Sequence, residues 1–378
     1  MSTLLVRGGT DAHGQPLDVT VVDGEITDPG VAVEPDRILD ANGLTVLPGL
    51  IDLQVNGAAG LDITAHPDGL WDVAAALPSY GVTAFAPTVI TADPATRDAA
   101  LAALREGPPV GWAGAVPLGL HLEGPMLAPT RRGAHPPHLL AAPTLELVAG
   151  WSRDAGILMV TMAPELPGAV EVVEHLAARG VVVCLGHTDA NTAQAAAAVA
   201  AGATAVTHLG NAMPPMLARE PGPVGLVLAG PDLVGGVIAD GHHLHPATLQ
   251  AFWRALGPVR FLAVSDTTAA LGMDRGHARL GDQDVLVADG TVRLADGTLA
   301  GSAASLSQCL AVLLATTQCS VAEAVATATS TPARLIGDGS RGSLERGRRG
   351  DVTLVDTSAG FDVVETVVGG EVVKGRPG

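Results

Sequence analysis

Eight apolar runs rich in β-branched residues recur along the middle of the chain, and alanine-rich windows with helical spacing fill most of the gaps between them. In the window at residues 69–81, for example, Trp71, Ala74 and Leu77 would lie on one helix face. Continuous apolar runs are typical of parallel strands that are buried on both faces. The runs cover residues 46–53, 82–89, 115–122, 157–164, 181–187, 203–208, 233–239 and 261–266.

Eight strand–helix units predict an α/β fold with a (β/α)8 TIM-type barrel, because right-handed units of this kind close into a ring at eight strands. An open doubly wound sheet is the alternative, but no glycine-rich phosphate turn is obvious after the first strand. Short β-rich segments at both ends of the chain are expected to pair into a small β-sandwich domain. The predicted domains are residues 1–47 and 338–378 for this small domain and 48–337 for the barrel.

Charge and composition exclude several classes of partner. A formal net charge of −18 argues against binding to nucleic acid or to an anionic membrane surface, because no basic field attracts phosphates. No secretory signal and no membrane-spanning run are visible. The three cysteines, Cys184, Cys309 and Cys319, fit no CxxC pattern, so we expect structural thiols in a reducing cytoplasm.

Polar residues of catalytic type gather where the predicted strands end. In a barrel of this class the active site lies at the C-terminal ends of the strands. Asp240, His242 and His243 follow the seventh predicted strand. The ends of the first, third, fifth, sixth and eighth strands carry Gln54 and Asn56, Glu123, His187, His208 and Asp266, respectively.

Taken singly, each of these residues has an ordinary structural interpretation, such as a hydrogen-bonded histidine or a carboxylate at a turn. Together, Glu123, His187 and His208 form the N/O ligand set of a catalytic divalent metal with an open coordination position. Such a metal lowers the pKa of water toward about 7 and polarises a carbonyl group. Asp266 could take the proton of the water and pass it to a leaving amine. The pattern therefore predicts hydrolysis of an amide or a related bond.

Several motifs in a fixed order resemble those of a known family. They include HLEGP (121–125), LGHTDA (185–190), THLGNAMPPM (207–216), REPG (219–222) and VSDTTAALG (264–272). Over nearly its whole length the chain resembles the N-acetylglucosamine-6-phosphate deacetylase family of the amidohydrolase superfamily. The resemblance implies metal-dependent hydrolysis of the acetamide of N-acetylglucosamine 6-phosphate to glucosamine 6-phosphate and acetate.

The resemblance also implies a role for individual residues. Glu123, His187 and His208 match metal ligands and Asp266 matches the catalytic acid/base. One divalent metal per chain is implied, with Zn²⁺ expected and Fe²⁺, Mn²⁺ or Co²⁺ as alternatives. One of the phosphate contacts is expected to come from the partner subunit of a homodimer. The positions that match substrate-binding residues are His135 for the sugar or the acetyl carbonyl, and Asn211, Ala212, Arg219 and His243 for the phosphate.

The chain departs from the wider superfamily at two places, and the role of one further histidine is open. Gln54 and Asn56 stand where many amidohydrolases carry HxH, and amide side chains are weak ligands, so we interpret them as a vestigial second-metal position. Gly210 stands where aromatic residues are common, which predicts a wider sugar pocket. His121 should share a strand face with Glu123, where it either steers that carboxylate or fills the barrel.

Other functions remain as alternatives at this stage. The substrate could belong to the galactosamine series, or the enzyme could be an N-acyl-amino-acid deacylase or a cyclic amidase. Arg219 and the NAM segment favour a phosphorylated substrate over the last two. A non-catalytic barrel is disfavoured because all four metal-ligand and acid/base positions are intact.

Overall fold

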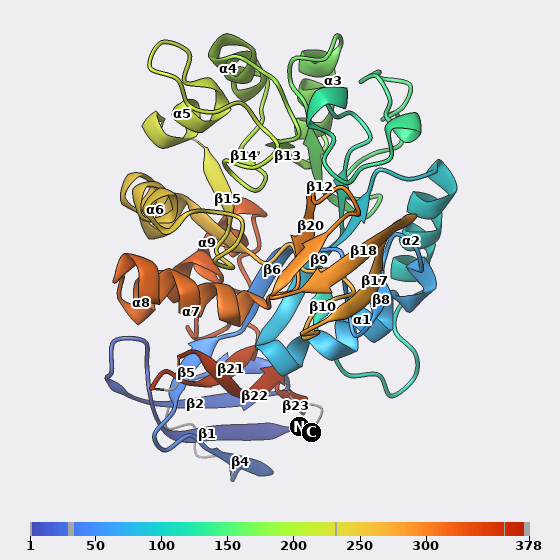
Figure 1. The fold of residues 1–378 in the computed structure, drawn as a ribbon. Coiled ribbons are helices and arrows are strands. Elements are labelled where there is room, and N and C mark those ends of the chain that lie inside the picture. Colours follow the sequence, from blue (N-terminus) through green and yellow to red (C-terminus); the bar gives the residue numbers. More distant parts are fainter. Residues whose placement is uncertain (1, 29–33, 231–232, 359, 374–378) are drawn as a thin grey trace.

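The computed structural model describes residues 2–28, 34–230, 233–358 and 360–373. At its centre, eight parallel strands pair in chain order, from β6 with β9 through to β15 with β16 (Figure 1). The short strand β10 (Val116–Pro117) pairs with β9 just before the third strand of the ring. The eight strands are β6 (Leu50–Val55), β9 (Val82–Ile90), β11 (Leu120–Glu123), β12 (Ile157–Met162), β13 (Val182–Leu185), β14 (Ala205–Val206), β15 (Val234–Ile238) and β16 (Phe261–Val264).

Contacts between the first and the last strand close this ring. Val55 forms a parallel bridge with Thr267, and the backbone N–H of Asn56 donates to the carbonyl oxygen of Thr267 at 2.8 Å. On the same seam the Asp52 carboxylate accepts a hydrogen bond from the Ser265 backbone N–H at 3.3 Å. The prediction of a (β/α)8 barrel is confirmed, and the open doubly wound alternative is wrong.

The strands are apolar along their whole length because both of their faces are buried. In β16, Phe261 and Ala263 pack with the surrounding helices, whereas Leu262 and Val264 belong to the cluster that fills the inside of the ring. Side chains of consecutive strand residues point to opposite faces, so a strand between two hydrophobic layers shows no polar alternation. The inside of the barrel is therefore a packed core and not a channel.

Helices cover the outside of the ring, and three of them begin with a reciprocal capping box that contributes about 1 kcal/mol each. The third unit differs: within residues 124–156, all of them described, there are 3₁₀ turns but no α-helix, since several prolines there remove backbone donors. Those turns are η3 (Pro129–Arg131) and η4 (Pro137–Leu139), and η1 (Pro67–Gly69) and η2 (Leu77–Tyr80) flank α1. The helices are α1 (Leu70–Ala76), α2 (Pro94–Glu106), α3 (Ala169–Ala177), α4 (Thr192–Ala200), α5 (Gly222–Ala229), α6 (Pro246–Arg260), α7 (Leu306–Thr317), α8 (Val321–Thr327) and α9 (Ser330–Leu335).

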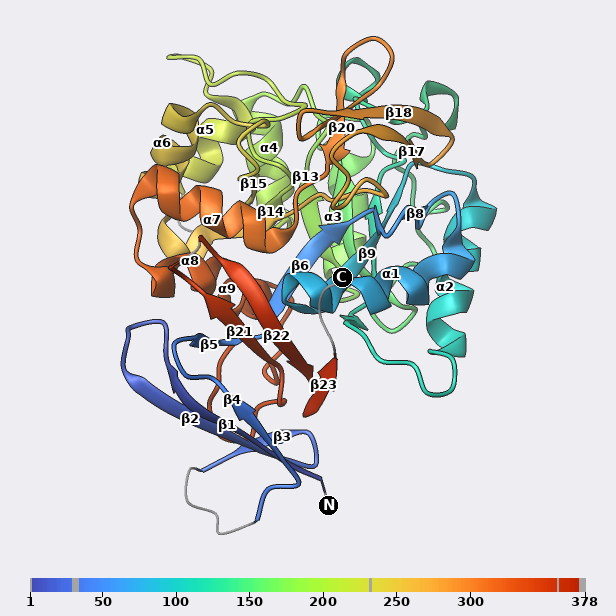
Figure 2. The ribbon, with the colours of Figure 1, turned by 60° about the horizontal axis from the view of Figure 1, so that its bottom comes forward.

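Both ends of the chain contribute to a second sheet, called the terminal sheet below, which surrounds its own apolar cluster (Figure 2). Thr353 and Thr366 donate hydrogen bonds to the carbonyl oxygens of Gly81 and Pro78, next to the start of β9. The domain boundaries at 47/48 and 337/338 stay predictions, and residues 1, 29–33, 359 and 374–378 of the predicted small domain lie outside the described residues. The strands are β1 (Thr3–Thr10), β2 (Pro16–Val22), β3 (Glu25–Thr27), β4 (Arg37–Asp40), β5 (Thr45–Pro48), β21 (Val352–Asp356), β22 (Asp362–Val368) and β23 (Glu371–Val373).

An antiparallel sheet that the sequence reading did not predict follows β16, at the end of the barrel opposite the terminal sheet (Figure 2). The backbone N–H of Ser302 in this sheet donates to the carbonyl oxygen of Asp266 at 2.9 Å, so the sheet lies directly beside a candidate catalytic residue. A two-stranded ribbon, β7 (Gly57–Ala58) with β8 (Leu61–Asp62), follows β6. The strands of the four-stranded sheet are β17 (Gly276–Leu280), β18 (Gln283–Ala288), β19 (Thr291–Arg293) and β20 (Leu299–Ser302).

Within the described part of the chain, no helix is both long enough and apolar enough to cross a membrane.

Candidate active site

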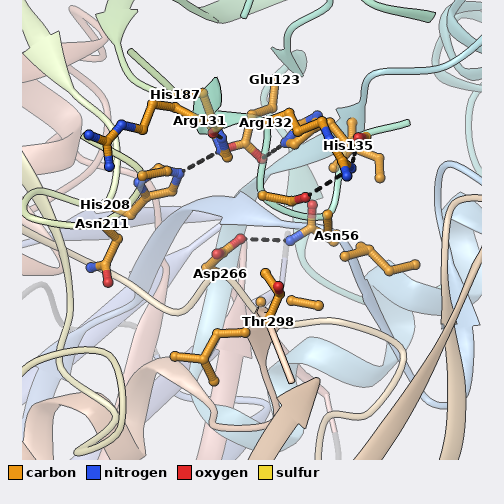
Figure 3. A pocket seen from close by; sticks show the side chains of 18 of the residues that line it. Asn56, Glu123, Arg131, Arg132, His135, His187, His208, Asn211, Asp266 and Thr298 are labelled. Carbon is orange, nitrogen blue, oxygen red and sulfur yellow. Dashed lines mark hydrogen bonds and ion pairs between the residues drawn. The ribbon is translucent and has the colours of Figure 1, made fainter. Parts of the chain in front are cut away.

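A cavity of about 450 Å³ opens at the C-terminal ends of the barrel strands, called the mouth below, and most of the residues predicted for the site line it (Figure 3). A cavity of this size at this end of the barrel is the expected place for a small-molecule site. The predicted residues in its wall are Asn56, Glu123, His135, His187, His208, Asn211, Ala212, His243 and Asp266.

Glu123, His187 and His208 place three possible ligand atoms around one point. The Nε2 atoms of His187 and His208 lie 3.3 and 3.2 Å from Oε1 of Glu123, and 2.9 Å from each other. Ligands about 2.0–2.2 Å from a tetrahedral zinc ion lie about 3.3 Å from one another, so this spacing fits one shared ion.

The hydrogen bond at Nδ1 of His187 favours metal binding. Nδ1 lies 2.8 Å from the carbonyl oxygen of Arg131, which can only accept, so Nδ1 carries a proton and the tautomer with this hydrogen bond has its lone pair on Nε2. That lone pair faces Nε2 of His208 at 2.9 Å, an arrangement that a shared cation relieves. The donor set therefore fits a divalent metal of the zinc type.

The Glu123 carboxyl stays charged in this position. Burial favours its neutral form, but the adjacent imidazoles of His187 and His208, the second within hydrogen-bond distance at 3.2 Å, hold the pKa of Glu123 well below its usual range. Nε2 of Gln54 also donates to Oε1 of Glu123 at 3.2 Å. A charged, hydrogen-bonded carboxylate is the form that a metal ligand requires.

Asp266 is a buried carboxyl with an unusual environment. Burial and then the negative charge of Glu123 raise its pKa to about 7, against opposing contributions that include a hydrogen bond from Asn56. That hydrogen bond runs from Nδ2 of Asn56 to Oδ1 of Asp266 at 2.7 Å, and it leaves Oδ2 for other partners (Figure 3). A carboxyl that titrates near neutral pH is suited to proton transfer.

Gln54 and Asn56 have a contact that sequence reasoning missed. Each donates from its amide to one of the two mouth carboxylates, Gln54 to Glu123 and Asn56 to Asp266. Amide donors at the end of β6 thus hold carboxylates in place where a second metal would need ligands. Their positions at i and i+2 on one strand face were the available signal.

His135 lies next to the three ligand candidates, and its ligand atom groups with those of Glu123 and His187 within 4.8 Å. Its Nδ1, however, accepts a hydrogen bond from the Thr91 backbone N–H at 3.2 Å, and burial above all lowers its pKa to about 3. The neutral ring therefore carries its proton on Nε2, which makes it a hydrogen-bond donor rather than a metal ligand.

The backbone at the mouth is strained in a way that the sequence did not reveal. His187, His208 and Asp266 have φ values of 47°, 32° and 51°, in the left-handed region that non-glycine residues rarely adopt. Ala212 shares this conformation with φ of 49°. Such strain gathers at functional sites, where the surrounding fold holds it in place.

A buried carboxylate holds His243 in the cavity wall. Nδ1 of His243 lies 2.7 Å from Oδ2 of Asp240, which also accepts a hydrogen bond from the Ser302 hydroxyl at 3.1 Å. Burial opposes protonation of His243, but the hydrogen bond and charge of Asp240 prevail and raise the pKa of the imidazole. Asp240 thereby fixes a ring whose other nitrogen can serve an anionic or hydroxyl-rich ligand.

Three other histidines and Arg219 lie away from the cavity. The ring nitrogens of His121 contact the Leu53 carbonyl oxygen at 3.2 Å and the Thr161 hydroxyl at 2.7 Å, so His121 fills the barrel and does not steer Glu123. His242 does not line the cavity, and His245 caps α6. Arg219 is exposed and, unlike the other predicted substrate-binding residues, does not line the cavity of its own chain.

The cavity wall also contains residues that the sequence reading did not select. Arg131 and Arg132 come from the loop after β11 and are among the residues that line the cavity (Figure 3). Thr298, just before β20, and Gly301, within β20, come from the region of the unpredicted sheet. The doubled arginine in TRRGAH was a signal for the first pair, whereas the hairpins that bring the second pair here were not recognised.

Comparison with known proteins is consistent with this site. The model of the amidohydrolase family matches residues 45–373. N-acetylglucosamine-6-phosphate deacetylase from Rattus norvegicus is 37% identical over 392 residues, which cover 98% of this chain and 93% of the rat protein. The crystal structure of N-acetylglucosamine-6-phosphate deacetylase from Pasteurella multocida superposes with a TM-score of 0.90 and 27% identity, covering 99% of this chain and all of that one.

A third relative was solved with a bound ligand. It is a mutant N-acetyl-D-glucosamine-6-phosphate deacetylase from Mycobacterium smegmatis in complex with N-acetyl-D-glucosamine-6-phosphate. It is 32% identical to this chain with a TM-score of 0.88, and the match covers 99% of this chain and 100% of the other. The family match over most of the sequence and these relatives lead to one conclusion: the chain belongs to the amidohydrolase family.

Proposed function

We propose that this protein hydrolyses the acetamide of N-acetylglucosamine 6-phosphate and releases acetate and glucosamine 6-phosphate. The observation that carries the proposal is the cluster of Glu123, His187 and His208 beside a buried Asp266 in one cavity. Proteins named N-acetylglucosamine-6-phosphate deacetylase from Rattus norvegicus and Homo sapiens are 37% and 38% identical in sequence and cover 98% and 94% of this chain, which supports the proposal.

Glu123, His187 and His208 would hold one divalent metal, for which we infer zinc. When bound, the metal supplies Lewis-acid chemistry: it acidifies water and polarises the acetamide carbonyl. Gln54 keeps the Glu123 carboxylate oriented, and the Arg131 carbonyl does the same for His187.

Asp266 transfers the proton in this proposal. Its free oxygen takes a proton from water as the water oxygen bonds to the carbonyl carbon, and it delivers that proton to the amide nitrogen as the C–N bond breaks. Asn56 fixes the other oxygen of Asp266 during both steps. Nε2–H of His135 donates to the carbonyl oxygen, where negative charge develops.

Substrate recognition is assigned to the opposite wall. Asn211, the backbone of Ala212 and His243 would contact the phosphorylated sugar. Arg219 does not line the cavity at the mouth of its own chain, and we infer that it acts in the site of a second copy, in a homodimer located in the cytoplasm.

A substrate panel tests the proposal. Acetate release is measured with N-acetylglucosamine 6-phosphate, its unphosphorylated form and the galactosamine 6-phosphate analogue, alongside metal analysis of protein purified without chelator. We expect about one divalent ion per chain and a strong preference for the phosphorylated gluco substrate.

The matched variants are Arg219→Ala and, as a control on an exposed arginine, Arg275→Ala. Arg219→Ala should raise KM only for phosphorylated substrates, whereas Arg275→Ala should change nothing. Equal turnover of phosphorylated and unphosphorylated sugars, or activity without metal, would refute the assignment.

A further inference from the structure

The loop after β11, residues 124–136 and called the β11 loop here, follows His187 along most of its length. The Ala128 backbone N–H donates to the carbonyl oxygen of His187 at 2.9 Å, and the Arg131 carbonyl oxygen accepts from Nδ1 of the ring at 2.8 Å. The His135 ring meets the His187 ring edge-on, with centroids 4.5 Å apart. The orientation of this candidate ligand therefore depends on the course of the β11 loop.

Gly133 shows how closely the loop approaches the ring. Its φ of +55° lies in the left-handed region, and a Cβ at this position would stand 3.3 Å from Cε1 of His187. A side chain there would push the loop or the ring aside, so the packing tolerates little displacement of either.

Asp189 fastens this loop from outside the cavity. One of its carboxylate oxygens accepts a hydrogen bond from Nε of Arg131 at 2.5 Å, and the other accepts from the Thr130 hydroxyl. The two oxygens of Asp189 thus bind two consecutive residues of the β11 loop, Thr130 and Arg131. Arg131 is also the residue whose carbonyl oxygen accepts the hydrogen bond from His187. Asp189 itself does not line the cavity.

Hydrogen bonds from Thr188 and Asp189 to Glu165 and to the backbone of Ala212 hold the loop that carries Asp189 in place. Its backbone N–H donates to Oε1 of Glu165 at 2.6 Å, and the Thr188 hydroxyl donates to Oε2 of the same carboxylate at 2.5 Å. The Thr188 N–H donates to the carbonyl oxygen of Ala212 at 3.1 Å. The contacts to Thr130 and Arg131 therefore restrain the β11 loop and not Asp189.

We propose that Asp189 is a positioning residue for the metal: through Thr130 and Arg131 it keeps the Arg131 carbonyl on Nδ1 of His187, so that Nε2 stays directed at the ligand position. The inference rests on the metal-dependent function proposed above. Outer contacts that orient a ligating histidine typically change metal affinity by about 10- to 100-fold when they are lost.

The test measures how readily the zinc-loaded protein loses its metal to a chelator. Asp189→Ala should release zinc at a chelator concentration at least about tenfold lower than the wild type requires. Thr130→Ala should lower the required chelator concentration by a smaller factor. Asp98→Ala is the matched control, because Asp98 forms a comparable surface ion pair with Arg97 at 2.8 Å, and it should behave like wild type.

Excess zinc separates positioning from general damage. Because the proposed defect is in metal affinity, saturating zinc should restore the kcat of Asp189→Ala to near the wild-type value, and unfolding of the metal-free variant should match that of the metal-free wild type. If the substitution instead damaged the fold, saturating zinc would not restore kcat, and the metal-free variant would unfold more easily than the metal-free wild type.

The possible failures are distinguishable. Wild-type protein that binds no zinc would refute the proposed function. Wild-type protein that binds zinc while folded Asp189→Ala retains it equally well would overturn the role of Asp189 alone. Should Asp189→Ala not fold, Thr130→Ala decides, and unchanged zinc retention in that variant overturns the proposal.

Discussion

Two buried carboxylates, Asp266 at the mouth and Asp351 beside the terminal sheet, are held in opposite ways. Asp351 lies between two arginines, with Nε of Arg349 and Nε of Arg341 at 3.0 and 3.2 Å, and accepts from the Gly369 N–H at 2.7 Å. Asp266 receives an amide hydrogen bond from Asn56, and the negative charge of Glu123 adds to its burial.

The difference shows which buried negative charge is compensated by the protein itself and which one a bound cation would compensate. Burial raises the pKa of both carboxyls, but arginines oppose the rise at Asp351, whereas Glu123 reinforces it at Asp266. A buried charge without a compensating partner is costly. The terminal sheet balances its charge internally, and the mouth is arranged so that a bound cation would do so.

The largest expected effect is on catalysis. Asp266→Asn should lower kcat/KM for the deacetylation by about 10³-fold, because an amide cannot accept and return the proton. Steady-state kinetics with zinc-loaded protein measure this. Asp351→Asn serves as the control, and a similar loss of activity per folded molecule there would erase the distinction between the two carboxylates.

The second effect is on stability and affects the other carboxylate. Asp351→Asn should lower the free energy of unfolding by about 3 kcal/mol, since it removes the buried carboxylate that Arg341 and Arg349 share, although Arg341 keeps its ion pair with Asp338 at 2.8 Å. Urea unfolding of the metal-free protein gives the value. A loss below about 1 kcal/mol would show that the arginines do not need this carboxylate.

Metal removal should reveal the uncompensated charge at the mouth. A ligand present at a hundred times its Kd stabilises the folded state by about 2.7 kcal/mol, so chelation should lower Tm by several degrees and added zinc should restore it. Scanning calorimetry of the same sample before and after chelation makes the comparison. Glu123→Gln, which removes a predicted ligand charge, should remove most of the response.

The smallest effect concerns pH. Because the folded state raises the pKa of Asp266 to about 7, it holds a proton that the unfolded chain has released above pH about 4. The contribution of Asp266 to stability therefore falls as pH rises from about 4 to about 7 and is constant above that range.

Urea unfolding of the metal-free wild type and of metal-free Asp266→Asn, each at pH 5 and pH 8, measures this effect. The comparison isolates the pH-dependent contribution of Asp266 to stability because the two proteins share all their other titrating groups. We expect the variant to gain about 1 kcal/mol or more relative to wild type at the higher pH. An unchanged difference between the two pH values would show that Asp266 is not desolvated as the structure indicates.

The sequence was sufficient for the barrel because parallel strands buried on both faces need uninterrupted apolar runs, as β16 illustrates. It also placed Glu123, His187 and His208 in one cavity, since strand ends meet at one side of a closed barrel. The sheet at 276–302 was missed although Asp-Gly pairs at 289–290 and 296–297 are strong hairpin signals.

Other features were outside the reach of sequence patterns. The contact between Arg131 and Asp189 joins two loops that follow different strands, and its geometry depends on how both loops are packed. The left-handed backbone of His187, His208 and Asp266 depends on tertiary restraint, because local preference alone would avoid it. The amide contacts of Gln54 and Asn56 likewise required side-chain orientations across the barrel.

The pairing of β5 with β21 has a consequence for how the chain is made. β5 ends at Pro48 and β21 begins at Val352, so nearly the whole barrel is synthesised between the two partners. Until then one edge of β5 lacks its native neighbour, and an unpaired edge is a template for wrong association. The ring of eight strands can close during synthesis, whereas the terminal sheet is completed only after residues 352–373 have been made, through contacts of high sequence separation that form slowly.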